Sequence, residues 1–228
     1  MQPTRPALTT ERIVEVCRVL LVEGGADALV VREVARRLAV SAPAIYKHAA
    51  GRDDLLTLLI ADCQDEVAGA CAQARDTCRE DDAPAQLRSA TVAFRHWALQ
   101  HPREFHLLYG EPVVGYEAPV DGVTTRSARR FGDVFAGIYA QLLRDGRLRL
   151  PEQHELPPGF TGSLADDPVP RDAGLPPAAV YQFAKGFQRM LGLVSVEVSG
   201  HLAWAMADTE GFVMNELREL TDQLILPE

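Results

Sequence analysis

The sequence lacks the features that would direct a chain into a membrane or out of the cell. It has no run of about 18 apolar, uncharged residues, and residues 1–6 show no apolar stretch typical of a signal peptide. The four cysteines form no Cys-x-x-Cys pair, and no histidine accompanies them at metal-ligand spacing. We therefore expect a cytoplasmic protein with reduced thiols and no membrane partner.

The motifs of common enzymes are also missing. The chain has no Gly-x-Ser-x-Gly, His-Glu-x-x-His or Gly-x-Gly-x-x-Gly pattern and no phosphate-binding P-loop. His96, His101 and His106 recur every five residues, a spacing that does not align them on one helical face, so no metal site is expected. We predict that the protein is not an enzyme and that it holds no cofactor.

Charge is unevenly distributed along the chain. The total of 23 Lys+Arg against 32 Asp+Glu gives −9, which disfavours a protein that coats nucleic acid over its whole surface. Residues 1–52 contain 8 basic and 5 acidic residues, a net charge of +3, so residues 53–228 carry −12. This asymmetry indicates a small basic head that meets an anionic partner.

Apolar residues recur at helical spacing through most of the chain, and no sustained alternation of period two occurs. We therefore predict an all-α fold. Thr9 or Thr10 is a suitable N-cap for the first helix, and Asp208 for the last. Further helices are expected over 31–38, over 42–48, from Asp53 onward, and over 83–100, 102–109, 121–145, 177–204 and 208–224.

Proline separates one segment from the rest of the body. Residues 151–177 hold seven of the fifteen prolines and five acidic residues, a composition that predicts a long mobile loop without a helix or a central strand.

We divide the chain into a DNA-binding head, residues 1–52, and a ligand-binding and dimerisation domain, residues 53–228.

Three short helices in the first 50 residues have the proportions of a helix-turn-helix unit. The third helix would enter a groove of DNA, and its leading residues are small enough to let the backbone approach the bases. The side chains of Tyr46, Lys47 and His48 are donors suited to phosphate. The predicted DNA-binding residues are Arg32, Ser41, Ala42, Pro43, Ala44, Tyr46, Lys47, His48 and Arg52.

Residues 31–41, 44–48 and 51–56 together resemble the head of the TetR (tetracycline-repressor-like) family of transcriptional regulators. The resemblance implies that Ile45 packs inward while Tyr46 and Lys47 grip phosphates. Two positions depart from the family pattern: Ala49 stands where an aromatic residue is common, and Arg52 stands where a lysine is common. Ala49 removes bulk between the third and fourth helices, whereas Arg52 keeps the positive charge.

The body resembles one TetR subgroup, the WHG-type ligand domain. Residues 94–105 are similar to its Trp-Ala-x-x-His-Pro-x-x-Phe/Tyr signature, and residues 191–201 to its penultimate helix. Because bodies in this family diverge widely, this similarity suggests an ancestry and does not identify a ligand.

The expected helix over 177–204 is apolar nearly all round, so it needs an apolar neighbour on each of two sides. One neighbour is the core of its own chain; the other is either a second subunit or the rest of a monomeric core. The family resemblance implies a four-helix dimer bundle built from the last two helices of each chain. The predicted interface residues are Gly192, Ser195, Ser199, Phe212, Leu217 and Leu220.

Aromatic residues are concentrated in the middle of the body. At helical spacing they are either core residues or the walls of a largely apolar cavity for a small-molecule effector, with the proline-rich loop as a lid. The predicted ligand-binding residues are Phe94, Trp97, Phe105, Tyr109, Phe131, Phe135, Tyr139, Phe183 and Phe187.

These features together predict a ligand-responsive transcriptional regulator, a repressor that binds a palindromic double-stranded DNA operator as a homodimer and is released by a small, largely apolar molecule. The alternative is a ligand-binding or interaction protein whose DNA-binding head is vestigial and has no regulatory role.

Overall fold

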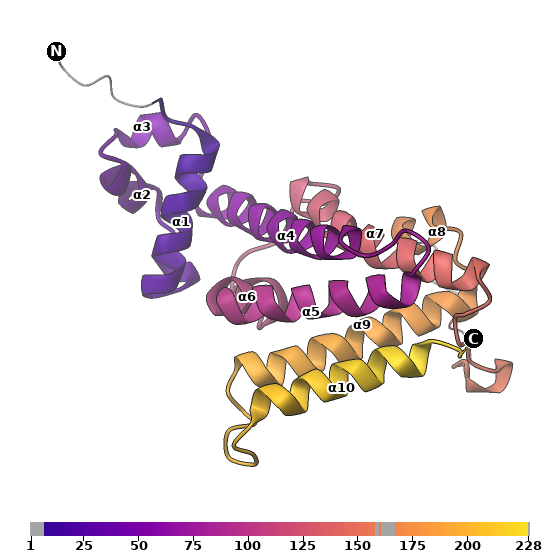
Figure 1. The fold of residues 1–228 in the computed structure, drawn as a ribbon. Helices are drawn as coiled ribbons and strands as arrows, with labels where there is room; N and C mark the ends of the chain where they lie inside the picture. The colour runs from indigo at the N-terminus through magenta and orange to yellow at the C-terminus, as the bar shows by residue number, and fades with distance from the viewer. Residues whose placement is uncertain (1–6, 158–159, 161–166, 228) are drawn as a thin grey trace. The chain divides into compact units, whose positions relative to one another are not determined.

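Figure 1 shows the computed structural model of the chain, in which the described residues are 7–157, 160 and 167–227. Within these ranges the regular structure is helical, apart from one isolated antiparallel bridge between Leu148 and Ile225, so the predicted all-α fold is confirmed. No helix in these ranges is long and apolar enough to cross a membrane. The helices are α1 (Thr10–Gly24), α2 (Val31–Leu38), α3 (Ala42–Ile45), α4 (Arg52–Asp76), α5 (Ala83–Gln100), α6 (Pro102–Tyr109), α7 (Val123–Arg144), α8 (Pro168–Asp172), α9 (Pro177–Val198) and α10 (Thr209–Leu224), with 3₁₀ turns at Ala26–Ala28 and Gln153–Glu155.

The chain forms two compact units. The first contains residues 1–65 and 101–128, and the second contains residues 66–100 and 129–228. The unbroken helix α4 begins in the first unit and ends in the second. The division into head and body after residue 52 was made from the motif, on a different basis from these units, and it stays a prediction.

Helix ends follow the local chemistry of the sequence. Thr9 is the N-cap of α1, and its hydroxyl oxygen accepts a hydrogen bond from the Arg12 backbone N–H at 3.4 Å. Asp208 caps α10 in the same way, because its carboxylate accepts from the Gly211 N–H at 2.8 Å. Both caps satisfy amide groups that have no partner inside the helix.

Three predicted elements differ from the structure. Helix α3 ends at Ile45 and not at residue 48, because the chain continues as a turn in which the His48 N–H donates to the Ile45 carbonyl at 2.8 Å. Helix α9 ends at Val198 and not at residue 204, because Gly200 adopts a φ of +69° that a right-handed helix excludes. In the proline-rich segment, the absence of a helix was wrongly predicted, since α8 forms with Pro168 and Pro170 in its first turn, where no intrahelical N–H bond is lost. The prediction of a mobile loop falls partly on 158–159 and 161–166, which lie outside the described residues.

Helices α5, α9 and α10 form the main packed layer of the second unit. Each contacts the other two, and Figure 1 shows them running alongside one another. Their apolar stripes meet in a common core. Buried residues of this core include Leu87, Phe94, Met190, Val194, Leu217 and Leu220.

A buried ion pair joins the same three helices. The guanidinium of Arg95 on α5 donates to both carboxylate oxygens of Glu197 on α9, at 2.7 and 2.6 Å. Their side chains are only 2% and 7% exposed. Glu210 of α10 lies 3.5 Å from the same guanidinium. The hydrogen bond that Arg95 donates to Glu197 is the main cause that raises the pKa of Arg95.

Removing one member of this pair leaves a charge buried without its partner. We expect Glu197→Ala to lower the free energy of unfolding by about 3–5 kcal/mol, measured by chemical denaturation. The matched control is Asp222→Ala, which breaks the half-exposed pair with Arg88 and should cost no more than about 1 kcal/mol. An equal loss of unfolding free energy in the two variants would show that the buried pair stabilises the fold no more than the half-exposed pair does.

Candidate nucleic-acid interface

The turn between α2 and α3 is closed by backbone hydrogen bonds. Ala39 adopts the left-handed region at φ +52°, and its N–H donates to the Arg36 carbonyl at 3.1 Å. The next N–H, that of Val40, donates to the Ala35 carbonyl at 2.9 Å. This pair of bonds is the Schellman motif, which ends α2 sharply and fixes the direction in which α3 leaves.

Burial of two side chains orients α3. Ile45 and Ala49 are buried, so the small residue at position 49 lies inside and not on the surface. Ser41 occupies the N-cap position with extended backbone, although its side chain makes no capping hydrogen bond, and a proline follows in the first turn. The inward packing implied for Ile45 by the family resemblance agrees with this arrangement.

The opposite side of α3 and the turn after it are open to solvent. Tyr46 is 54% exposed, and Lys47 and His48 are exposed beside it. The His48 Nδ1 lies 3.4 Å from the Thr10 hydroxyl of α1. Of the other predicted DNA-binding residues, Arg32, Ser41 and Pro43 are exposed, whereas Ala42 and Ala44 are half-buried.

Several basic residues of this region are already paired with carboxylates. Arg36 donates to Glu33 at 2.8 and 2.6 Å. Arg37 donates to Glu33 at 3.0 Å and also pairs with Glu23. Hydrogen bonds from Arg36, and then from Arg37, hold the pKa of Glu33 at about 2, so both pairs remain charged throughout the neutral range.

Arg52 is the predicted DNA-binding residue whose charge is paired with a carboxylate. Its guanidinium donates to Asp27 at 2.8 Å, which connects the start of α4 to the turn after α1. The side chains of Arg32 and Lys47, by contrast, make no hydrogen bond or ion pair within the described ranges. Fewer positive charges are therefore available to an anionic partner than the total of +3 indicates, and those among the predicted DNA-binding residues lie on the first turn of α2 and just after α3.

Sequence reasoning missed the roles of Glu23 and Glu33 in this pairing. The spacing of Glu33 from the two arginines, i+3 and i+4 on one helix, was a signal that was available. The contact between Glu23 and Arg37 joins α1 to α2 across 14 positions, and no local pattern indicates it.

The predicted ligand-binding aromatics form clusters within each unit. In the first unit, the rings of Phe105 and Tyr109 have centroids 5.3 Å apart. In the second unit, Phe131 contacts three other rings, with centroid separations of 5.5, 5.2 and 6.0 Å to Phe94, Phe135 and Phe187 respectively, and Tyr139 contacts Phe183 at 5.4 Å. Trp97 is buried as well. A ligand cavity among these residues stays a prediction.

The predicted interface residues divide into two groups. Gly192 and Ser199 are exposed on or just after α9, Ser195 is half-buried, and Phe212 is exposed on α10. Leu217 and Leu220 are buried by their own chain, because this side of α10 faces α5 and α9.

The cysteines are packed as small apolar residues. Cys17, Cys63 and Cys71 are buried, Cys78 is half-buried, and all four are free. Burial raises the pKa of the Cys17 and Cys71 thiols to about 12, so these two lack the thiolate character that a redox sensor needs at neutral pH.

Comparison with known families covers both parts of the chain. Residues 7–59 match the family described as bacterial regulatory proteins, tetR family. Residues 87–220 match the tetracyclin repressor-like, C-terminal domain.

Individual proteins agree with these matches. The chain is similar to the HTH-type transcriptional regulators Rv1816 of Mycobacterium tuberculosis (strain ATCC 25618 / H37Rv) and Mb1846 of Mycobacterium bovis (strain ATCC BAA-935 / AF2122/97), with 39% identity over 128 residues in each case. The match covers 55% of this chain and 55% of each relative, so the chain spans about half the length of the curated relatives it matches.

Solved structures share the fold. The regulatory protein SCO4313 is 26% identical, with a TM-score of 0.72 over 92% of this chain and 94% of that chain. A tetR family transcription regulator from Shewanella sp. PV-4 is 17% identical, with a TM-score of 0.63 over 97% and 100% of the two chains.

The carboxylate pairs of α2 generate a prediction about charge. Glu33→Gln removes the main partner of Arg36 and one partner of Arg37, so we expect tighter binding to random-sequence DNA and a salt dependence steeper by up to about one unit in the logarithmic slope. The measurement is fluorescence anisotropy at several salt concentrations.

The matched control is Glu15→Gln, which changes the net charge equally at an exposed position of α1 but releases no arginine. An equal change of slope in both variants would show that total charge matters and that the pairing does not.

Proposed function

Because this chain belongs to the TetR family of bacterial regulatory proteins, we propose that it binds a palindromic DNA operator as a homodimer and releases it when a small, largely apolar effector binds. It is a helix-turn-helix transcriptional regulator and not an enzyme. We propose further that it acts as a repressor in the cytoplasm, where its operator is accessible.

The observation that carries this proposal is the exposed Tyr46–Lys47 pair next to the buried Ile45. The buried isoleucine fixes the helix, so the phenol and the ammonium stand at one defined place as donors for phosphate oxygens. Contacts of this type position a protein on DNA, whereas the small residues that open α3 allow the backbone to approach base edges.

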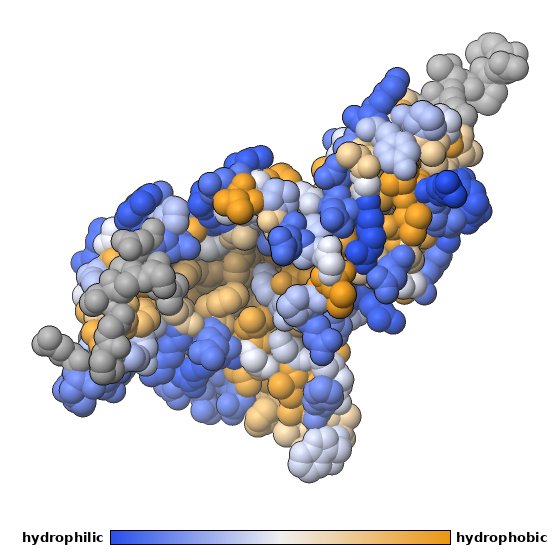
Figure 2. Space-filling view, turned by 180° about the vertical axis from the view of Figure 1, so that it is seen from behind, coloured by the Kyte–Doolittle hydropathy of each residue, from blue (hydrophilic) through white to orange (hydrophobic). Residues whose placement is uncertain are grey.

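A palindromic operator requires two heads related by a two-fold axis, with half-sites about one helical turn or a multiple of it apart. We place the dimer contact on the exposed side of α9 and α10. Apolar side chains are available there: Val196 and Phe212 are each 38% exposed, and Trp204 in the following loop is 89% exposed. Figure 2 shows hydrophobic residues gathered near this loop, at the lower edge of the view. In this proposal Leu217 and Leu220 support the interface from beneath.

For the effector we propose a cavity bordered by the aromatic cluster of the second unit around Phe131, in a body of the WHG type. Burial of aromatic rings favours apolar ligands. The effector must bind the DNA-free arrangement more tightly than the DNA-bound one, and a preference of about 10⁴-fold would nearly invert their populations. Helix α4 is the element through which such a change would pass, because it is continuous from Arg52 to Asp76.

Replacing Tyr46 and Lys47 with alanine removes the proposed phosphate donors without touching the buried Ile45. We expect weaker operator binding and a logarithmic salt slope reduced by about one unit for each lost contact. Anisotropy titrations with the operator DNA measure both quantities. Unchanged affinity and slope would exclude this surface as the DNA contact.

A bulky residue at the exposed Gly192 tests the dimer contact. The space around a Cβ added at Gly192 is open, so a side chain can leave the helix there, and in Gly192→Trp the fold should persist while the subunits separate. Light scattering should report a monomer, with helical content unchanged by circular dichroism. A dimer of unchanged stability would show that the interface lies elsewhere on the chain.

The alternative of a vestigial head is decided by mapping the sites that the protein occupies on genomic DNA. Enrichment of a palindromic sequence, lost in the Tyr46 and Lys47 variant, supports regulation. Absence of any enriched palindrome favours a ligand-binding or interaction protein.

A further inference from the structure

Charges of opposite sign are separated between the neighbouring helices α9 and α10. Helix α9 contains two basic residues, Lys185 and Arg189, and one acidic residue, Glu197. Glu197 is buried in its pair with Arg95, whereas the two basic residues are exposed. The exposed charge of α9 is therefore entirely positive, and we call Lys185 and Arg189 the positive row.

Helix α10 has the opposite character, with four acidic residues and one basic residue, Arg218. Arg218 lies on the side of α10 next to α5, where it lines a groove together with Arg88. Glu216 and Glu219 follow the exposed Phe212 at steps of four and three residues, a spacing that aligns these three on another side of the helix. We call Glu216 and Glu219 the negative row.

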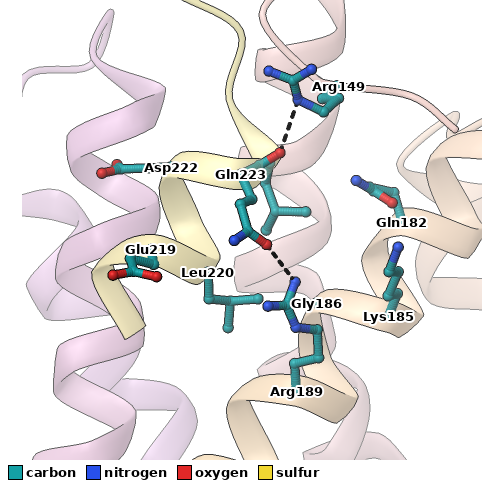
Figure 3. A pocket seen from close by; sticks show the side chains of 10 residues that line it. Arg149, Gln182, Lys185, Gly186, Arg189, Glu219, Leu220, Asp222 and Gln223 are labelled. Carbon is teal, nitrogen blue, oxygen red and sulfur yellow. Dashed lines mark hydrogen bonds between the residues drawn. The ribbon is translucent and has the colours of Figure 1, made fainter. Parts of the chain in front are cut away.

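The two rows border the same groove. This groove lies between α9 and α10, has a volume of about 510 Å³, and is lined by Lys185, Arg189 and Glu219 among others. Figure 3 shows the first two on α9 and the third on α10. Arg189 donates to the side-chain oxygen of Gln223 at 3.0 Å, so its guanidinium is held in place by a neutral group and keeps its charge.

The two rows do not neutralise each other within one chain. No ion pair joins them in the described ranges, and the side chains of Lys185 and Glu216 make no hydrogen bond there either. Glu219 accepts a hydrogen bond from the Asn215 amide at 2.7 Å, which is another neutral partner. Both rows therefore present their charge to the partner that covers this face.

A face with a positive row beside a negative row is complementary to itself. In a dimer with a two-fold axis, each contact between two different residues occurs twice, once in each direction between the copies. The positive row of each copy can therefore lie against the negative row of the other. Gly192 lies one turn beyond Arg189 on the exposed side of α9, and the exposed Val196 and Phe212 continue the same face.

We propose that a second copy of the chain covers this face, and that the positive row of each copy forms ion pairs with the negative row of the other. The pairing rests on the dimer contact proposed above, and it fixes the register of the two copies along α9 and α10. Complementary charges of this kind select the partner and its orientation, whereas the apolar side chains of Val196 and Phe212 contribute to affinity through burial.

Reversal of one row makes the two copies repel each other. The α9 variant carries Lys185→Glu and Arg189→Glu, and the α10 variant carries Glu216→Lys and Glu219→Lys. Because each row is used twice in the dimer, we expect either variant to raise the dissociation constant of the dimer by at least about tenfold. Analytical ultracentrifugation of the full chain measures this constant at low salt, where exposed charges are screened least.

Combining the two reversals separates pairing from damage to the fold. An equimolar mixture of the α9 and α10 variants should form a heterodimer, because every contact then joins opposite charges. A chain that carries all four substitutions should form homodimers as the unsubstituted chain does. A misfolded subunit would be rescued in neither case. The matched control is Arg218→Glu, a reversal on the side of α10 next to α5, which should leave the dissociation constant unchanged.

Three results would overturn the pairing. One is an unchanged dissociation constant in both reversal variants, and another is an equal rise in the Arg218 control. The third is a loss of the dimer that neither the mixture nor the fourfold variant restores. Gly192→Trp distinguishes this failure from failure of the dimer contact itself. Monomers of Gly192→Trp beside unchanged dimers of both reversal variants would keep the contact and remove the ion pairs, whereas unchanged dimers of all three would place the interface elsewhere.

Discussion

The function of this protein depends on a helix that is too short to be stable alone. A four-residue helix has no appreciable stability in water, so α3 exists only because Ile45 is packed into the core of the first unit. The Schellman closure after α2 sets the direction of the chain, and the buried Ala49 limits how far α3 stands from its neighbours. These buried residues set the positions of the exposed Tyr46 and Lys47. In the proposed function, specific contact with DNA therefore depends on apolar packing.

Electrostatics adds a second constraint on the same surface. Most of its arginines are engaged with carboxylates of α1 and α2, and the pairing between Arg37 and Glu23 fastens those helices together. Their charges contribute to the structure and little to the outside potential. The field that reaches DNA comes from few side chains, which is compatible with an acidic protein that binds one site and avoids the rest of the genome.

The second unit uses charge differently. The side chains of Arg95 and Glu197 are both removed from water, and the free-energy cost of this desolvation is offset only by their bidentate hydrogen bonds. These bonds fix the separation of α5 and α9. On the same helix, Arg189 donates to the neutral side chain of Gln223 at 3.0 Å. A charged group held by a neutral partner keeps most of its field, whereas the charges of Arg95 and Glu197 offset each other.

Local sequence determines much of this architecture. Helical periodicity, the caps at Thr9 and Asp208, and the motif over residues 31–56 act within a few residues, so they determined the all-α fold, most helix limits and the residues on the exposed side of α3. Local rules failed at α8, where prolines in a first turn permit a helix, and at the end of α9, where Gly200 turns the chain.

Only the tertiary structure decided which charges remain available. Arg95 and Glu197 are 102 positions apart, and the paired Arg88 and Asp222 are 134 positions apart. Sequence periodicity shows which face of a helix is apolar, but the partner of a buried polar group is set by packing between distant helices.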